Sequence, residues 1–330
     1  MTLHLKRRDA LTLGTTAVFG ATALFVTSAH AATYPDTLIK LVLPYAPGGS
    51  TDLFARIVAE GMTKRLGQTV IVDNWPGSNG MIGIDAVMRA PPDGYTVLFS
   101  LTSVIQNPLL YTSVKYDPFK DIQPVSELGR MPTVLVVGSQ VQASTPDQFV
   151  KLARAKPGEY SYATTGVGGS SHLYGEMLQD AAKIQLLHVP YKGEAQAIND
   201  LLGGQVSAAF ISARSAAQHT ATGKMRPLAV VGKSRAPLAT EVPTFAEQGF
   251  ADMDAVGWFA LYPPQGTPRD ITNKLQTTAH AVVNDPAMAG RIGALSIIPN
   301  GSTPEALLSS MRFDYDRWAR IIKAKNIRLD

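Results

Sequence analysis

Two glycine-rich turns contain the residues best suited to bind a ligand. The first reads PYAPGGSTD over Pro44–Asp52, and the second reads TTGVGGSSH over Thr164–His172. Glycine lets backbone N–H groups approach a ligand closely, and the N-terminus of the helix expected after each turn favours an anion. Serine and threonine hydroxyls add further donors. Either turn alone equally fits an ordinary capped connection between a strand and a helix, but the pair favours an anion site.

A third turn of the same kind reads NWPGSNG over Asn74–Gly80. In the first turn, we expect Asp52 to complement the dipole of its helix rather than to touch an anionic ligand. If the glycine amides hold the anion, replacing Gly48 or Gly168 by a bulky residue is expected to abolish binding while the fold survives.

Known catalytic and cofactor motifs are not matched. Ser171 stands where a dinucleotide fingerprint requires glycine, and His172 stands where a nucleophile elbow at Ser170 requires glycine. The sequence contains no phosphate-binding P-loop and no HExxH zinc motif. We therefore expect no catalytic residue, no metal site and no cofactor. A hydrolase in which Ser170 acts with His172 is a remote alternative, because residues so close in sequence rarely form that pair.

The elements that position these turns are short apolar strands that alternate with amphipathic helices. A buried strand at 38–43 precedes the first turn, and a helix with apolar residues from Leu53 to Leu66 follows it and stops at Gly67. This order of strand, helix and strand predicts parallel sheet. Further strands are expected at 70–72, 96–100, 133–138, 160–164, 186–189, 206–211, 228–231 and 256–262, and further helices at 81–89, at 195–202 and from His172 onward.

Three more helices are expected to begin with Thr followed by Pro, at residues 145, 267 and 303. Thr caps such a helix and Pro fits its first turn, while Gln148 stands at the capping-box position of the first of them. Because the alternating pattern restarts after 133–138, we expect an α/β protein with two lobes. Lobe 1 comprises 32–132 together with 253–330, and lobe 2 comprises 133–252.

Composition excludes several classes of protein. The chain has 330 residues, of which 45% are hydrophobic and 17% are charged, so it is long and apolar enough for about two domains with a core. The absence of cysteine excludes disulfides, thiolate metal sites and a lipid anchor. The net charge is +4, and Lys6, Arg7, Arg8 and Asp9 account for half of it. Nucleic-acid binding therefore has little support.

Residues 1–31 have the pattern of a cleavable export signal. Lys6–Arg8 form a basic start, an apolar stretch at 11–26 follows, and Ala29–Ala31 fits a cleavage site. The adjacent arginines fit the twin-arginine route as well as the Sec route. A membrane anchor is the alternative, but the apolar stretch is short for a span and is interrupted by glycine and threonine. We expect the mature protein in the periplasm.

The order of the motifs resembles the Bug family, the substrate-binding proteins of tripartite tricarboxylate transporters. The matching segments extend over 34–330 and read PYAPGGSTD, NWPGSNG, PPDGYTVLFS, TTGVGGSSHL, VPYKGEAQAINDLLGGQV, VPTFAEQGF and RWARIIKAKNIRLD. The resemblance implies a Venus-flytrap protein with two Rossmann-like lobes and a ligand in the cleft. It also implies delivery of that ligand to a carrier made of a large and a small membrane subunit, and it implies a monomer.

The resemblance further implies that the two glycine turns hold one carboxylate of the ligand through backbone N–H groups and bridging waters. The strand end at 100–103 and the turn at 190–193 also face the cleft in such proteins, and the Lys192 ammonium lies either near the anion or in solvent. The expected ligand-binding residues are Tyr45, Pro47, Gly48, Gly49, Ser50, Thr51, Trp75, Ser78, Asn79, Ser100, Thr102, Thr165, Gly166, Gly168, Ser170, His172, Tyr191, Lys192 and Ser212.

Two departures from the family pattern bear on the ligand. Trp75 stands where many members have Arg or Lys, and Ser212 stands where amino-acid binders have an Asp that receives the ligand ammonium. We therefore expect a small organic carboxylate, preferably a dicarboxylate without an ammonium group, with aromatic terephthalate as one example. A sensor that presents the same ligand to a membrane kinase is the alternative to a transport protein.

Overall fold

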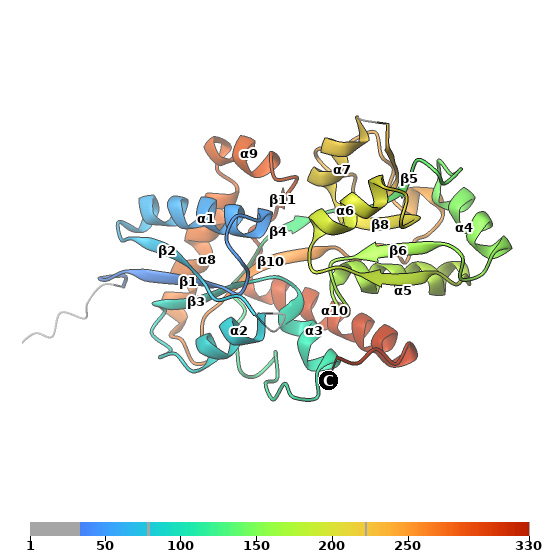
Figure 1. Cartoon of the computed structure of the whole chain (residues 1–330). Coiled ribbons are helices and arrows are strands. Elements are labelled where there is room, and N and C mark those ends of the chain that lie inside the picture. Colours follow the sequence, from blue (N-terminus) through green and yellow to red (C-terminus); the bar gives the residue numbers. More distant parts are fainter. Residues whose placement is uncertain (1–33, 78–79, 222, 330) are drawn as a thin grey trace, which may run out of the picture. The chain divides into compact units, whose positions relative to one another are not determined.

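Alternating strands and helices build a mixed α/β fold with two sheets, which confirms the predicted class (Figure 1). The computed structural model describes residues 34–77, 80–221 and 223–329. The proposed export signal and two predicted site residues, Ser78 and Asn79, therefore lie outside the described residues. None of the helices in the described part of the chain is long and apolar enough to cross a bilayer.

The first sheet has the strand order β11-β4-β10-β3-β1-β2. β1 pairs in parallel with both β2 and β3, as the sequence predicts, whereas β10 pairs antiparallel with β3 and β4. The prediction of parallel sheet, made from the order of the first three strands and their helices, is therefore confirmed. The antiparallel part was not predicted, and it arises because β10 enters from the second sheet instead of following a crossover helix. The strands are β1 (Ile39–Leu43), β2 (Val70–Asn74), β3 (Thr96–Ser100), β4 (Ser126–Met131), β10 (Gly257–Tyr262) and β11 (Ile298–Pro299).

The second sheet has the order β7-β6-β8-β5-β9 and repeats this mixture. β6 pairs in parallel with β7 and β8, while β5 pairs antiparallel with β8 and β9. Only Pro132 separates β4 of the first sheet from β5 of the second, and the chain returns to the first sheet between β9 and β10. The strands are β5 (Thr133–Gly138), β6 (Ser161–Thr164), β7 (Leu187–Pro190), β8 (Ala208–Ser212) and β9 (Met225–Val231).

Helices cover both faces of the second sheet. Val134 and Val136 of β5 pack with α6 and α7, while Leu135 and Val137 belong to the cluster that contains α5. Figure 1 shows α6 and α7 on one side of this sheet and α5 on the other. The helices are α1 (Ser50–Leu66), α2 (Met81–Met88), α3 (Ser103–Leu110), α4 (Pro146–Ala155), α5 (Ser170–Ala182), α6 (Glu194–Leu202), α7 (Ala213–Thr220), α8 (Arg269–Val283), α9 (Pro286–Gly293) and α10 (Pro304–Ala324), with a short 3₁₀ helix at Ala246–Gln248.

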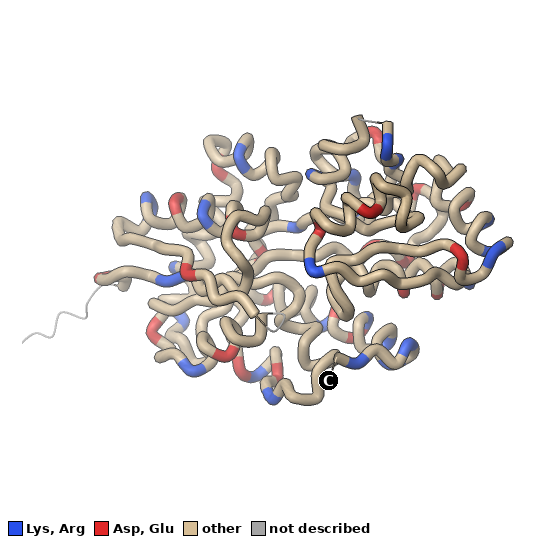
Figure 2. The backbone as a smooth tube through the Cα atoms, viewed as in Figure 1, with Lys and Arg blue, Asp and Glu red and all other residues tan. Residues whose placement is uncertain are grey.

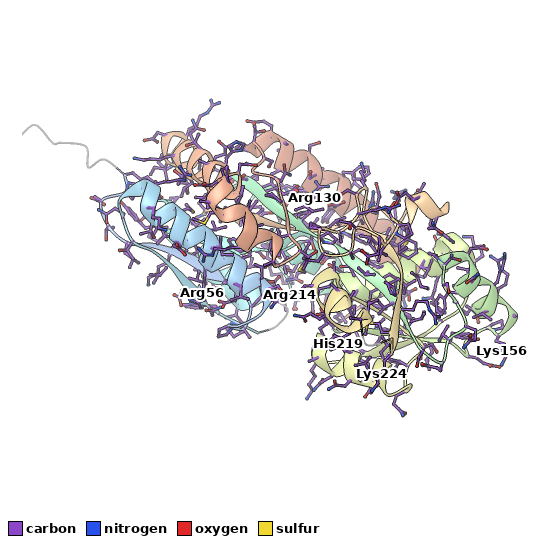
Figure 3. The ribbon with its side chains drawn as sticks, turned by 90° about the horizontal axis from the view of Figure 1, so that it is seen from above. Arg56, Arg130, Lys156, Arg214, His219 and Lys224 are labelled. Carbon is purple, nitrogen blue, oxygen red and sulfur yellow. The ribbon has the colours of Figure 1, made fainter. Side chains whose placement is uncertain are left out.

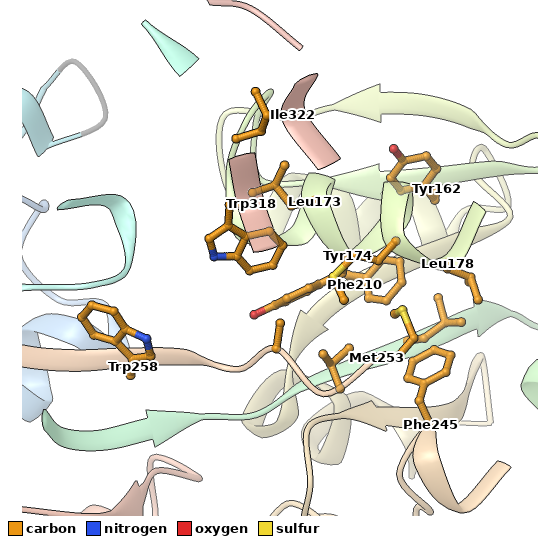
Figure 4. Close-up of a cluster of buried hydrophobic side chains, with 14 of the residues drawn as sticks. Tyr162, Leu173, Tyr174, Leu178, Phe210, Phe245, Met253, Trp258, Trp318 and Ile322 are labelled. Atoms are coloured by element: carbon orange, nitrogen blue, oxygen red, sulfur yellow. The ribbon is translucent and has the colours of Figure 1, made fainter. Parts of the chain in front are cut away.

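The largest apolar cluster includes residues of both sheets and of α10. Figure 4 shows Tyr174, Phe210 and Trp318 in this cluster, and the Tyr174 and Trp318 ring centroids are 6.2 Å apart. At its other end, Trp258 of β10 donates to the Asp314 carboxylate on α10 over 2.8 Å. Helix α10 therefore packs against elements that belong to both sheets.

Two of the three predicted Thr-Pro helix starts are confirmed. Thr145 Oγ1 accepts from the amide of Gln148, and Thr303 Oγ1 accepts from that of Ala306. The third is wrong, since α8 begins at Arg269 and the Thr267 hydroxyl instead donates to the Pro264 carbonyl. Helices α3, α7 and α9 and strands β4 and β11 are absent from the sequence-based prediction.

Candidate ligand-binding site

The first glycine turn joins β1 to α1 and is fixed by a buried carboxylate. Gly49 is the N-cap of α1, and Gly48 adopts a φ of +92°. Asp52 Oδ2 accepts the Gly48 amide over 3.0 Å, and its two oxygens also accept hydrogen bonds from Arg56 and Asn74. Burial raises the pKa of Asp52, but these hydrogen bonds together hold that pKa below its usual value. Asp52 thus organises the turn from within.

The second glycine turn joins β6 to α5 and has the same construction with a histidine in place of the carboxylate. Gly169 is the N-cap of α5, and His172 Nδ1 accepts the Gly168 amide over 3.0 Å. Ser171 Oγ accepts the amide of Thr165 over 3.1 Å. In both turns, the third helical residue therefore accepts the N–H of the glycine that precedes the N-cap.

This pairing decides which amides are left for an anion. The amides of Gly48 and Gly168 are bound within the protein, so these glycines shape the turns and do not offer their own N–H groups. The amides of the first helical turn lack an acceptor within their helix, as at any helix N-terminus. In α1 and α5 these are the amides of Ser50, Thr51 and Ser170, together with that of Ser171.

A pocket of about 190 Å³ lies where residues from elements of the two sheets meet. Thr102 Oγ1, just before α3, is 3.4 Å from Ser170 Oγ at the start of α5. The pocket is therefore bordered by the second glycine turn on one side and by the end of β3 on the other. Its lining residues are Tyr45, Leu101, Thr102, Ser103, Gln106, Met131, Thr133, Thr165, Gly169, Ser170, Ser171, Glu194, Phe210, Ile211 and Ser212.

Five of the sequence-predicted site residues line this pocket, namely Tyr45, Thr102, Thr165, Ser170 and Ser212. Tyr45 is held there by a hydrogen bond of 2.7 Å between its hydroxyl and Ser103 Oγ. The second glycine turn and the end of β3 are thus both represented in this pocket, whereas the first turn contributes only Tyr45. That these residues bind a ligand stays a prediction.

The remaining described candidates lie outside the pocket lining. His172 and Ser100 are buried, Trp75 has 42% of its surface exposed, and the Tyr191 hydroxyl donates to Asp200 over 2.7 Å. Lys192 is exposed after β7. The others belong to the two glycine turns themselves, and they are Pro47, Gly48, Gly49, Ser50, Thr51, Gly166 and Gly168.

Glu194 and Gln106 are among the polar residues of the pocket that are absent from the sequence-based prediction. Glu194, the first residue of α6, accepts the Ser212 hydroxyl over 2.8 Å through Oε1 and the Ser212 amide over 3.3 Å through Oε2. Gln106 on α3 is only 2% exposed. Glu194 did not stand out, because an acidic residue in the first turn of a helix is usually interpreted as a partner of the helix dipole. Gln106 did not stand out either, because the hydrophobic periodicity of the sequence does not reveal α3.

Glu194 removes the reason for disfavouring an ammonium group. The sequence disfavours an amino-acid ligand because Ser212 replaces the Asp that receives the ammonium in amino-acid binders. The pocket does contain a carboxylate, which comes from α6 and is anchored on Ser212 itself.

Charged residues contribute little else to the pocket. Among the described residues that line it, Glu194 alone is charged. Figure 2 shows acidic and basic residues interspersed along the chain, and Figure 3 shows Arg56 on α1 and Arg214 at the start of α7. An anion in this pocket would therefore depend on amides and hydroxyls more than on a lysine or arginine in direct contact.

A pair of stacked histidines supports the second turn. The rings of His172 and His188 are 3.9 Å apart at their centroids and nearly parallel, and Thr164 Oγ1 is 2.7 Å from His188 Nε2. Burial, followed by the proximity of His172, lowers the pKa of His188 to about 4. Burial also lowers the pKa of His172, against a smaller opposite effect of Glu176. Both rings are therefore neutral near pH 7, which His172 requires to accept the Gly168 amide.

Comparison with protein families gives one match that covers most of the chain. Residues 54–327 match the family described as tripartite tricarboxylate transporter family receptor, TctC. A protein encoded in the tcbD-tcbE intergenic region of Pseudomonas sp. strain P51 is 35% identical over 88% of this chain and 86% of its own length. BugT of Bordetella pertussis is 33% identical over 94% of this chain and 96% of its own length.

Solved structures of similar proteins share this architecture. The periplasmic binding protein BugD is 32% identical, with a TM-score of 0.76, over 90% of this chain and all of its own. Rpa4515 of Rhodopseudomonas palustris with adipate is 30% identical, with a TM-score of 0.79 and the same coverage. MatC of that organism with bound malate is 26% identical, with a TM-score of 0.75, over 88% of this chain and all of its own.

Proposed function

We propose, from the premise that the chain belongs to the TctC family of tripartite tricarboxylate transporter receptors, that it captures a small organic carboxylate in the pocket lined by the second glycine turn, the end of β3 and Tyr45 of the first turn. It would then deliver that ligand to a membrane carrier with a large and a small subunit. The protein is a solute-binding receptor of the Bug type, and its relatives are binding proteins rather than enzymes.

The arrangement of helix N-termini carries this proposal. The first turn of α5 presents amides without an acceptor in the helix, and the Ser170 and Thr102 hydroxyl oxygens lie 3.4 Å apart at the pocket. A carboxylate needs several donors and no large net positive charge, and such amides supply them. Because the donors come from elements of both sheets, the ligand would favour the conformation in which the two sides meet.

The narrower form of the proposal concerns the ligand itself. The sequence favours a dicarboxylate without an ammonium group, such as terephthalate, and the structures of relatives contain adipate and malate. Presentation of the ligand to a sensor kinase is the second candidate, since it needs the same capture step. A hydrolase is not proposed, because His172 Nδ1 already accepts the Gly168 amide.

Several features complete the proposal. Residues 1–31 would be a signal removed on export to the periplasm by the Sec or twin-arginine route, leaving a monomer. Residues 32–132 with 253–330 would form one lobe and 133–252 the other, in keeping with the sheets to which their strands belong. The Lys192 ammonium would lie near the anion or in solvent. The part of the ligand away from the bound carboxylate would be contacted by Trp75, Ser78, Asn79, Ser100, Thr102 and Ser212.

Proline at the first position of α5 tests the role of the helix amides. Ser170→Pro removes one N–H at a position where proline is well accommodated, and Gly169 has the extended backbone (φ −69°, ψ 165°) that a residue before proline prefers. Ser170→Ala removes the hydroxyl but keeps the amide and is the matched control. We expect calorimetry against a panel of mono- and dicarboxylates to show binding by the wild type, a loss of about tenfold or more in Ser170→Pro, and a smaller loss in Ser170→Ala.

Two results would contradict the proposal. If the wild type binds no carboxylate of the panel, the proposed class of ligand is wrong. If Ser170→Pro binds as tightly as the wild type, the amides of α5 do not hold the ligand.

A further inference from the structure

The pocket proposed to bind an anion contains a carboxylate side chain of its own, that of Glu194. Glu194 lines the pocket, and no lysine or arginine in the described part of the chain forms an ion pair with it. The amide and the hydroxyl of Ser212 each occupy one acceptor site on the Glu194 carboxylate, the amide on Oε2 and the hydroxyl on Oε1. An ionised carboxylate has about four such sites, so Glu194 keeps capacity to accept further hydrogen bonds.

A second residue of the pocket, Gln106 on α3, carries an unpartnered donor. Gln106 is 2% exposed, and its Nε2 has no hydrogen-bond partner. Buried polar groups are nearly always hydrogen-bonded, because a donor withdrawn from water without an acceptor costs free energy. Because Gln106 lines the same pocket as Glu194, we infer that a bound ligand brings an acceptor atom to its Nε2.

We propose that Glu194 and Gln106 determine which carboxylate this receptor accepts, and that the ligand carries a hydrogen-bond donor, either hydroxyl or ammonium, in addition to its carboxylate. This inference rests on the proposed function. The first-turn amides hold the carboxylate, Glu194 accepts from the donor of the ligand, and Gln106 Nε2 donates to a ligand oxygen. A ligand whose second polar group is a carboxylate meets the like charge of Glu194, which selects against it.

This selection reverses the preference inferred from Ser212 alone. A site built to accept a hydrogen bond rejects an analogue that lacks the donor, because the polar group of the site is then left unpaired. Plain dicarboxylates are therefore expected to bind more weakly than hydroxy or amino acids of the same length.

Matched ligands and a charge-removing variant test the role of Glu194. The C4 set is succinate, L-malate and L-aspartate, and the aromatic set is terephthalate, 4-hydroxybenzoate and 4-(aminomethyl)benzoate. In at least one set, calorimetry on the wild type should show a donor-bearing ligand binding about tenfold or more tightly than the plain diacid. Glu194→Gln should reduce that ratio by about tenfold, with unchanged or increased affinity for the diacid.

Glu305→Gln is the matched control. Glu305 also lies in the first turn of a helix, but it is on α10, is exposed and does not line the pocket. Its replacement therefore removes one negative charge from a helix N-terminus, as Glu194→Gln does, without changing the pocket. An unchanged ratio in Glu194→Gln, or a wild type that prefers the plain diacid in both sets, overturns the inference while leaving carboxylate binding intact. Failure of every compound to bind contradicts the proposed function as well.

A second variant separates binding from packing at Gln106. Gln106→Leu removes the unpaired donor at similar size, so the free energy of unfolding should be unchanged or increased while ligand affinity decreases about tenfold. A variant that loses stability and keeps the wild-type affinity would show that Gln106 is structural and would overturn its part in recognition.

Discussion

At the scale of single residues, the two glycine turns resemble each other in sequence but differ in their surroundings. Gly48 and Gly168 both have positive φ, +92° and +76°. A Cβ on Gly48 would meet nothing within 4 Å, whereas one on Gly168 would lie 2.5 Å from Leu329 Cδ1 and 2.9 Å from Leu110 Cδ1. We therefore expect the fold to tolerate a bulky residue at position 48 better than at position 168.

Alanine at each glycine should reveal this difference. Gly48→Ala is expected to lower the free energy of unfolding by about 1 kcal/mol, from the left-handed backbone alone. Gly168→Ala should cost about 2 kcal/mol or more, because the methyl group also displaces packed leucines. Urea unfolding of the two purified variants measures both values, and equal losses would contradict the packing argument.

At the scale of elements, β7 and α5 are coupled through the His172–His188 stack. His172 belongs to the first turn of α5, and its neutral Nδ1 keeps the second glycine turn in place. The groups that face this stack are Tyr162, Thr164 and Glu176. Protonation of His188 would add a positive charge between packed elements, whereas a charge on His172 would be partly offset by Glu176, whose Oε1 is 3.8 Å from His172 Nε2.

Stability should consequently decrease in mildly acidic solution. The pKa of His188 is lowered from 6.5 to about 4, so between these values the unfolded chain binds more protons than the folded chain. The free energy of unfolding should fall by about 1–3 kcal/mol as the pH drops through this window, and this contribution should level off below about pH 4. Urea unfolding of wild type and His188→Gln at several pH values isolates the effect. A constant difference between them would refute it.

At the scale of the whole molecule, α10 connects elements of the two sheets through two tryptophans. Both indoles are buried, but Trp258 Nε1 donates to the half-buried Asp314, whereas Trp318 Nε1 has no partner and packs against Tyr174. One contact is thus polar and specific, and the other is apolar.

Replacement of each tryptophan by phenylalanine should separate these contributions. Trp258→Phe leaves the Asp314 carboxylate without its indole donor, whereas Trp318→Phe removes no hydrogen bond. We expect denaturant unfolding to show that Trp258→Phe lowers the free energy of unfolding by about 1–2 kcal/mol more than Trp318→Phe does. A larger loss in Trp318→Phe would show that packing outweighs the hydrogen bond.

The sequence by itself determined the features that depend on neighbours along the chain. Apolar runs in the sequence predict strands β3 and β5, and Thr-Pro pairs predict the capped starts of α4 and α10. The residue types of the two glycine-rich segments likewise predict turns. The acceptor at the third helical position, Asp52 or His172, is equally local, since it lies four residues after the glycine whose amide it binds. The sequence-based prediction nevertheless assigned Asp52 to the helix dipole and His172 to the ligand.

Only the tertiary structure decided which of these features share a site. Thr102 and Ser170 are 68 positions apart, and Glu194 reaches Ser212 from another element, so no periodicity in the sequence connects them. The antiparallel strands β5 and β10 likewise depend on where the chain crosses between sheets. Local propensities act over a few residues, whereas a pocket is formed by side chains that only long-range packing brings together.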